Sequence, residues 1–123
     1  MILELDTTSE IPIYQQIRNS IVIGIARGKL KEGDSLPSVR SLASSIGINL
    51  HTVNKAYNLL KDEGYLVVDR RNGAMVHLDF KGKEEKFMDS LKENIEISIA
   101  ECIVRKVEEE EIIRIIKEKF KGI

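Results

Sequence analysis

The chain has 123 residues, of which 42% are hydrophobic, and its formal net charge is −1. This length suits one modest domain with an appendage and is too short for two independent cores. Apolar runs far shorter than the roughly 18 residues of a membrane span, and the lack of a basic-then-apolar leader, predict a soluble cytoplasmic protein. The single cysteine, Cys102, excludes an intramolecular disulfide framework, and two separated histidines favour neither a metal site nor a cofactor.

Charge is distributed unevenly along the chain. Residues 36–73 carry five basic and three acidic residues, whereas the tail holds an unbroken acidic run, Glu108–Glu111. A locally basic face is therefore compatible with the negative total. Charge alone does not indicate a nucleic-acid partner.

The first predicted helix covers residues 13–27. Pro12 stands near its first position, where proline is favoured, and Gly28 is placed to end it. Its apolar residues recur at the spacing of one helix face: Tyr14, Ile17, Ile21 and Ile25.

A helix-turn-helix is predicted next. Ser38 is a suitable N-cap for a second helix, and Gly47 ends that helix after about two turns. Asn49 is the natural cap of a third helix, which ends at Glu63 and Gly64. The apolar stripe of the third helix consists of Val53, Ala56, Tyr57 and Leu60. Its opposite, polar face consists of His51, Lys55, Asn58 and Asp62, with Thr52 and Asn54 on the flanks.

A β-hairpin follows the third helix. Residues 65–68 and 74–78 are rich in strand-forming side chains, and the turn Arg71-Asn72-Gly73 lies between them. Asn-Gly between two such runs is a strong hairpin signal, and we expect Gly73 to adopt a positive φ. The hairpin would form the wing of a winged helix-turn-helix.

Residues 79–123 contain no proline and carry apolar residues at helical intervals, which predicts a tail that is helical throughout. Whether this tail is one helix or two is left open. A break near residues 105–107 is favoured, because Glu108–Glu111 suits a new N-terminus and Lys117, Lys119 and Lys121 suit a C-terminus. The predicted fold class is mainly α with a small β-wing: an N-terminal winged helix-turn-helix, residues 1–78, followed by a short C-terminal helical dimerisation tail, residues 79–123.

Several blocks of residues, taken together, resemble a known family. They are Ile11-Pro12-Ile13-Tyr14-Gln15-Gln16-Ile17, then Gly33-Asp34-Ser35-Leu36-Pro37-Ser38-Val39-Arg40-Ser41-Leu42-Ala43, then Asn49 with Thr52-Val53, and finally Leu59-Leu60-Lys61-Asp62-Glu63-Gly64. In this combination and spacing, residues 10–78 resemble the GntR family of bacterial regulators. The chain is too short for that family's long effector domains or aminotransferase-like fusions, so it is similar to the YtrA subfamily. The resemblance implies a repressor that binds inverted repeats, often at transporter operons, and dimerises through a short pair of tail helices.

The resemblance also implies DNA contacts from the second helix, the third helix and the wing. Arg40 suits a two-pronged contact with guanine or phosphate, and Lys55 suits a phosphate. Leu50 departs from the family pattern, in which that position is commonly arginine or proline, so no arginine base contact is carried over. The expected DNA-binding residues are Ser38, Arg40, Asn49, His51, Thr52, Asn54, Lys55, Arg70, Arg71, Asn72 and Gly73.

Each of these residues also has a simpler interpretation. The polar face of the third helix can be a solvated surface, Arg40 can form a surface salt bridge, and a charged hairpin turn can contact only water. His51 has no partner at metal-ligand spacing on its helix, so a groove contact is favoured over a metal.

Dimerisation is assigned to the apolar residues of the tail. Such a stripe is more often an intramolecular core, but two helices of this length cannot bury it alone. A two-fold dimer predicts a palindromic operator in double-stranded DNA. Cys102 is expected to be a small buried residue rather than a redox sensor. The predicted dimerisation residues are Met88, Leu91, Ile95, Ile99, Cys102, Ile112, Ile113 and Ile116.

Two other functions are weighed against DNA binding. A winged helix also serves as a protein–protein interaction module, although the polar, acid-free start of the third helix argues against this use. An enzyme would need convergent nucleophile, base or metal groups, and no such constellation is present in the sequence. The 45-residue tail leaves little volume for a ligand site of about 300 Å³ or more, so no small-molecule effector is assigned.

Overall fold

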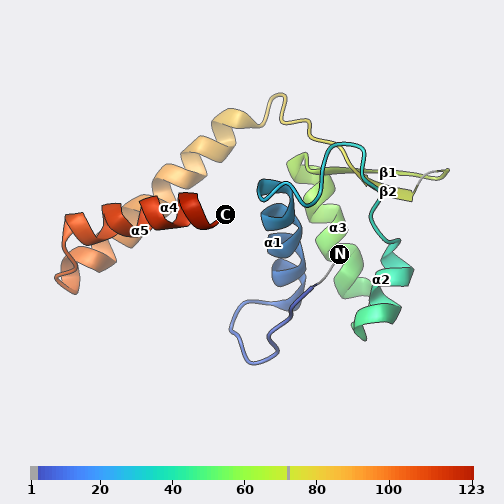
Figure 1. The fold of residues 1–123 in the computed structure, drawn as a ribbon, viewed down its shortest axis with the longest axis horizontal. Coiled ribbons are helices and arrows are strands. Elements are labelled where there is room, and N and C mark those ends of the chain that lie inside the picture. Colours follow the sequence, from blue (N-terminus) through green and yellow to red (C-terminus); the bar gives the residue numbers. More distant parts are fainter. Residues whose placement is uncertain (1–2, 72) are drawn as a thin grey trace. The chain divides into compact units, whose positions relative to one another are not determined.

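The computed structural model describes residues 3–71 and 73–123 (Figure 1). The chain divides into two compact units, Met1–Phe80 and Lys81–Ile123. The first contains α1 (Ile13–Ala26), α2 (Val39–Ile46), α3 (Leu50–Glu63), β1 (Leu66–Asp69) and β2 (Gly73–Val76). The second contains α4 (Glu84–Val104) and α5 (Glu109–Gly122). The described residues are thus mostly helical with one small antiparallel sheet, which confirms the predicted fold class.

The ends of α2 and α3 are set by the residues that the sequence indicated. The Ser38 side chain accepts a hydrogen bond from the Ser41 N–H at 3.0 Å, and the Asn49 side chain accepts one from the His51 N–H at 2.8 Å. Each cap satisfies a backbone donor that has no partner within its helix. Gly47 ends α2 in the left-handed region, with φ 67°. The predicted helix-turn-helix is therefore present.

The core of the first unit lies where α3 packs against α1 and α2. Its buried residues come from all three helices, from the segment before α2 and from both strands. They are Ile17, Ile21, Leu36, Leu42, Ala43, Val53, Ala56, Tyr57, Leu60, Leu66, Ala74 and Val76. Because this core includes the predicted apolar stripe of α3, the opposite face of that helix is directed to solvent.

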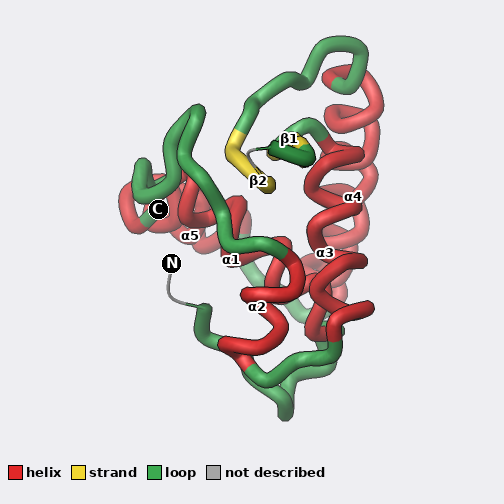
Figure 2. The backbone as a smooth tube through the Cα atoms, turned by 90° about the vertical axis from the view of Figure 1, so that its right-hand side faces the viewer, coloured by secondary structure: helices red, strands yellow, loops and turns green. Residues whose placement is uncertain are grey.

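The strand pair lies at one end of the three helices (Figure 2). Leu66 is opposite Val76, and Asp69 is opposite Gly73. Residues 33–36 run beside β2 as a short paired segment. The Leu36 N–H donates to the Ala74 carbonyl and the Val76 N–H donates to the Asp34 carbonyl, both at 2.8 Å. This pairing connects the segment before α2 to the wing.

The predicted strand boundaries were wrong by one or two residues. Tyr65 precedes β1 because its N–H closes the end of α3 on the Leu60 carbonyl at 2.9 Å. Leu78 lies beyond β2 because its N–H donates to the Glu32 carboxylate at 2.9 Å. Gly73 is the first residue of β2 and has φ 68°, which confirms the expected positive φ.

The tail consists of two helices separated at residues 105–108, as the favoured break predicted. The prediction of helix from residue 79 was wrong, because α4 begins at Glu84. The Asp79 N–H is bonded to the Gly64 carbonyl, and the Phe80 ring packs edge-on against Tyr65 at 5.2 Å between centroids. Among the described residues, no helix is long and apolar enough to cross a membrane.

Candidate nucleic-acid interface

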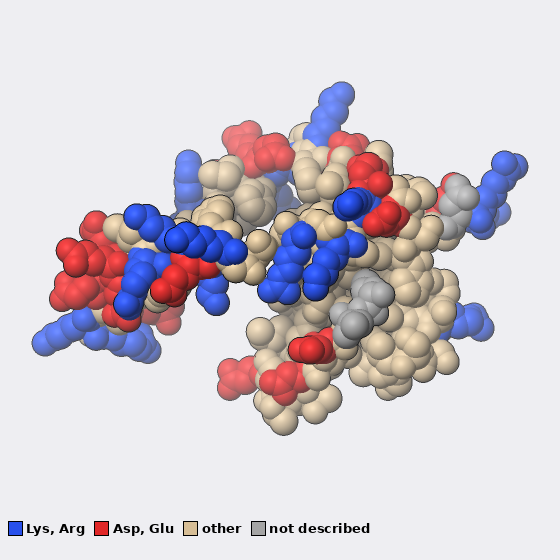
Figure 3. All heavy atoms as spheres, in the orientation of Figure 1, with Lys and Arg blue, Asp and Glu red and all other residues tan. Residues whose placement is uncertain are grey.

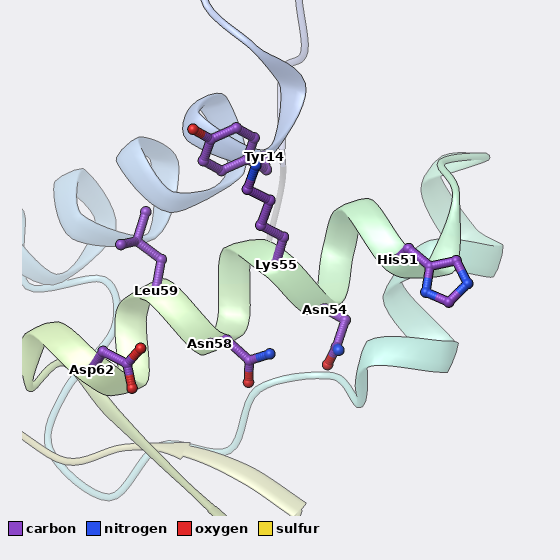
Figure 4. A pocket seen from close by; sticks show the side chains of 7 residues that line it. All are labelled: Tyr14, His51, Asn54, Lys55, Asn58, Leu59 and Asp62. Atoms are coloured by element: carbon purple, nitrogen blue, oxygen red, sulfur yellow. The ribbon is translucent and has the colours of Figure 1, made fainter.

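Five exposed side chains form the outer face of α3: His51, Asn54, Lys55, Asn58 and Asp62. They line an open groove of about 450 Å³ together with Tyr14 of α1 and Leu59 (Figure 4). His51 projects from the first turn of the helix, while Asn54, Asn58 and Asp62 follow one another along it. Apart from the Asp62 carboxylate toward its C-terminal end, this face presents amide, imidazole and ammonium groups, which are the donors and acceptors that read base edges and bind phosphates.

The first turn of α3 suits an anion. It contains no acidic residue, and the sequence has no aspartate or glutamate between Asp34 and Asp62. The helix dipole places partial positive charge at this end, where backbone N–H groups are directed outward. Over the α2 end of the unit, Figure 3 shows neutral and basic side chains. The charge of this surface is therefore compatible with a phosphate backbone, although the net charge of the chain is negative.

Lys55 makes a contact that the sequence did not indicate. Its Nζ lies 4.0 Å from the centre of the Tyr14 ring, and Figure 4 shows the side chain reaching toward α1. A cation over an exposed aromatic ring is stabilised by about 0.5–1 kcal/mol. The ammonium is therefore held at the rim of the groove, and the contact limits its rotamer freedom.

The remaining predicted residues of α2 and α3 occupy distinct positions. Arg40 is exposed in the first turn of α2, and Asn49 and Ser38 are exposed caps whose side-chain oxygens each accept a backbone hydrogen bond. Thr52 is half-buried rather than fully exposed. Arg40 and the outer face of α3 thus belong to the same helix-turn-helix, while the two caps are already engaged in fixing the helix starts.

The wing tip is basic and exposed. Arg70 and Arg71 are both exposed, and the Arg71 N–H donates to the Asp69 carboxylate at 2.6 Å, which stabilises the turn. Basic side chains project at this end of the hairpin in Figure 3. Asn72, which was also predicted to contact DNA, lies outside the described residues.

Two interactions hold α3 in position. The Arg18 guanidinium of α1 forms a two-pronged pair with the Glu63 carboxylate, with N···O distances of 3.0 and 2.9 Å, and this hydrogen bonding raises the pKa of Arg18. The Tyr57 hydroxyl donates to the Pro37 carbonyl at 2.7 Å, and burial raises the pKa of Tyr57 to about 12. The middle and the C-terminal end of α3 are therefore tied to neighbouring segments.

Sequence reasoning missed Tyr14 and Asn58 as members of this surface. Tyr14 was assigned only to the apolar stripe of the first helix, and its contact with Lys55 joins residues 41 positions apart, which no local pattern records. Asn58 was placed on the correct face of α3 but was not selected as a site residue. Among the described residues, no group of three or more histidine, cysteine, aspartate or glutamate side chains is arranged to hold a metal ion.

The tail exposes the residues that were predicted to dimerise. Neither α4 nor α5 contains a buried residue. Met88, Leu91, Ile95 and Ile99 are exposed along one side of α4, Ile113 and Ile116 are exposed on α5, and Cys102 and Ile112 are half-exposed. Cys102 is half-exposed within the single chain, and its burial at a dimer interface stays a prediction. Further exposed apolar residues, which the prediction omitted, are Phe87, Ile97, Ile103, Val104, Ile115 and Phe120.

The family follows from comparison with known proteins. The sequence model described as "Bacterial regulatory proteins, gntR family" matches residues 13–76, which include the whole helix-turn-helix and the wing. This chain belongs to the GntR family. The predicted family is thereby confirmed, and its members are transcription regulators rather than enzymes.

Individual relatives extend this result to the tail. The chain is 36% identical to the HTH-type transcriptional repressor YtrA of Bacillus subtilis over 117 residues, which cover 94% of this chain and 90% of YtrA. A solved structure of a transcriptional antiterminator from Listeria monocytogenes is 28% identical and superposes with a TM-score of 0.90 over 97% of this chain and 90% of that one. Similarity therefore includes the helices α4 and α5 as well as the first unit.

A second similar structure contains DNA. The DNA-binding domain of AraR in complex with operator ORX1 is 29% identical, with a TM-score of 0.52, and the match covers 60% of this chain and 92% of that domain. Domains of this type thus bind operator DNA. Family membership and the YtrA relationship make this GntR-family chain a DNA-binding transcriptional regulator.

Proposed function

We propose that this regulator is a cytoplasmic repressor that binds a palindromic operator as a homodimer, with the first turns of α3 in the major groove. The observation that carries the proposal is the exposed, acid-free start of α3, where His51 and Asn54 project from a helix whose other side is buried in the core. An α-helix fits the major groove, and amide and imidazole groups can bond base edges there. The operator complex of AraR supports this use of the fold.

The remaining predicted residues surround this contact. Arg40 in the first turn of α2 would bind guanine or phosphate in a two-pronged manner, and Lys55 would bind phosphate from the rim of the groove. Arg70 and Arg71 at the wing tip would lie along the adjacent backbone or minor groove. The caps Asn49 and Ser38, and the half-buried Thr52, would contribute mainly through the backbone N–H groups that they orient.

The homodimer is proposed from the tail. Two helices that bury none of their side chains lack the tertiary packing from which most helix stability comes. Residues 79–123 hold ten basic and twelve acidic residues, so two copies would not repel one another strongly. A second copy offers the same exposed apolar residues, and an isologous two-fold interface would cover them. The symmetry of the dimer would then be matched by the symmetry of the operator.

DNA binding is tested by a salt titration with two matched variants. Fluorescence anisotropy would measure the affinity of the full chain for fragments of its upstream region, and log K should fall linearly with log salt. Lys55→Ala should weaken binding and reduce the slope by about 1, because one phosphate contact is lost. Lys29→Ala removes an exposed lysine in the loop after α1 and should change neither quantity.

Two outcomes would contradict this part of the proposal. A folded wild-type protein that binds no fragment at low salt would exclude DNA as the ligand and favour a protein–protein module. Equal slopes for the two lysine variants would show that α3 does not face the phosphate backbone.

A further inference from the structure

Leu50, the first residue of α3, is an apolar side chain on a polar surface. The helix, which the structure describes in full, has five large apolar side chains, and Val53, Tyr57 and Leu60 are at most 1% exposed. Leu59 is half-buried, whereas Leu50 is 40% exposed. The core therefore accounts for three of these side chains, Leu59 lines the groove, and much of Leu50 faces outward.

The position of Leu50 places it among the groups that are proposed to enter the major groove. It directly follows the cap Asn49 and precedes exposed His51, and exposed Asn54 lies one turn further along the helix. Residues four apart on a helix lie on the same side, so Leu50 and Asn54 are neighbours. An apolar side chain thus lies next to a side chain suited to hydrogen-bond a base edge.

We propose that Leu50 is a specificity residue that contacts the C5 methyl group of a thymine in each operator half-site. Thymine is the base that presents a methyl group in the major groove, and burying that methyl against an aliphatic side chain removes both from water. Leucine cannot satisfy the amino group of cytosine or adenine, which would lose its water on binding and gain no partner. The proposal rests on the proposed function, because it requires α3 to lie in the groove.

The test removes the methyl group from the DNA and the aliphatic group from the protein. The probe is the tightest-binding duplex selected from a random library by the full-length protein. Each thymine is replaced singly by deoxyuridine, which keeps base pairing and phosphates and lacks only the methyl group. Affinities are measured for the wild type, Leu50→Ala, Leu50→Met and Ile23→Ala, the last a matched control because Ile23 on α1 is 39% exposed.

One thymine in each half-site should lose about fourfold in affinity when it becomes deoxyuridine, the effect expected from a single buried methyl group. This loss should disappear in Leu50→Ala, remain in Leu50→Met and remain in full in Ile23→Ala. Thermal unfolding followed by circular dichroism would check that each variant is folded. If Leu50→Ala is unfolded, Leu50→Gln takes its place, because it retains bulk without the aliphatic branch.

The proposal would be overturned if every deoxyuridine replacement changed the affinity of the wild type and of Leu50→Ala by the same factor. DNA binding itself would then remain intact. The same is true if the sensitive thymine stays equally sensitive in Leu50→Ala, because another group would then contact its methyl. Failure of the wild type to select any duplex is a different result, and it would contradict the proposed function itself.

Discussion

Tyr57 connects α3 to the segment that leads into α2. Its side chain is 1% exposed, and its hydroxyl donates to the Pro37 carbonyl at 2.7 Å. A buried tyrosine needs such a partner, because a hydroxyl without one costs free energy. The same burial raises the pKa of Tyr57 to about 12, since the phenolate is poorly solvated there.

This burial predicts an alkaline loss of stability. The folded-state pKa lies above the unfolded value of about 10, so the contribution of Tyr57 is fully present below pH 10 and is lost as the pH rises toward 12. Tyr57→Phe should cost about 1 kcal/mol at neutral pH, because the Pro37 carbonyl loses its donor. Between pH 10 and 12, however, the melting temperature of Tyr57→Phe should fall less steeply than that of the wild type. If the melting temperatures of the two proteins, measured at equal protein concentration, fell equally steeply between pH 10 and 12, this assignment would be contradicted.

At the scale of elements, the two helices of the helix-turn-helix end in the same way but in different surroundings. Gly47 and Gly64 both adopt positive φ, 67° and 96°, directly after α2 and α3. A Cβ at Gly47 would meet no atom within 4 Å, whereas a Cβ at Gly64 would overlap the carbonyl oxygen of Asp79. Gly64 is therefore required for the close approach of the segment after β2, and Gly47 for its backbone conformation alone.

This difference predicts unequal effects of alanine at the two sites. Gly47→Ala should lower the free energy of unfolding by about 1 kcal/mol, the cost of a left-handed residue with a Cβ. Gly64→Ala should lower it by roughly 3 kcal/mol or more, because backbone must also move. Urea denaturation of both variants measures the difference. Equal losses would show that the contact with Asp79 has no energetic consequence.

The elements differ in how far the sequence specifies them. The bounds of α2 and α3 were predictable because Ser38, Gly47 and Asn49 act locally, through their own caps and φ angles. The strand ends and the start of α4 were not, because they depend on long-range bonds such as that from the Leu78 N–H to the Glu32 carboxylate. The pairing of residues 33–36 with β2 likewise joins segments that are distant in the sequence.

In the candidate site, too, the features set by local sequence were predictable and those set by long-range packing were not. Helical periodicity alone placed His51, Lys55 and Asn58 on the outer face of α3, and the structure agrees. The contact between Lys55 and Tyr14 required the packing of α1 on α3 to be known. Thr52 lies on the flank of the polar face, where helical periodicity alone does not determine how far a side chain is buried.

The two units of the molecule differ in how they are stabilised. The first contains the whole buried core of the described residues, whereas α4 and α5 bury nothing. We therefore expect a charge in the apolar stripe of α4 to affect association more than folding of the first unit. Ile95→Asp would place a carboxylate in that stripe, and Ser90→Asp would place one on the opposite side of the same helix.

Hydroxyl-radical footprinting of the selected duplex tests the central claim, that two copies present their α3 helices to a symmetric site. The wild type and Ser90→Asp should each protect two patches related by a two-fold axis, with centres about 10–10.5 base pairs apart or a multiple of that spacing. Ile95→Asp should protect the duplex only weakly, because a single copy makes half of the contacts. A wild-type footprint that is asymmetric and spans one half-site would contradict the account.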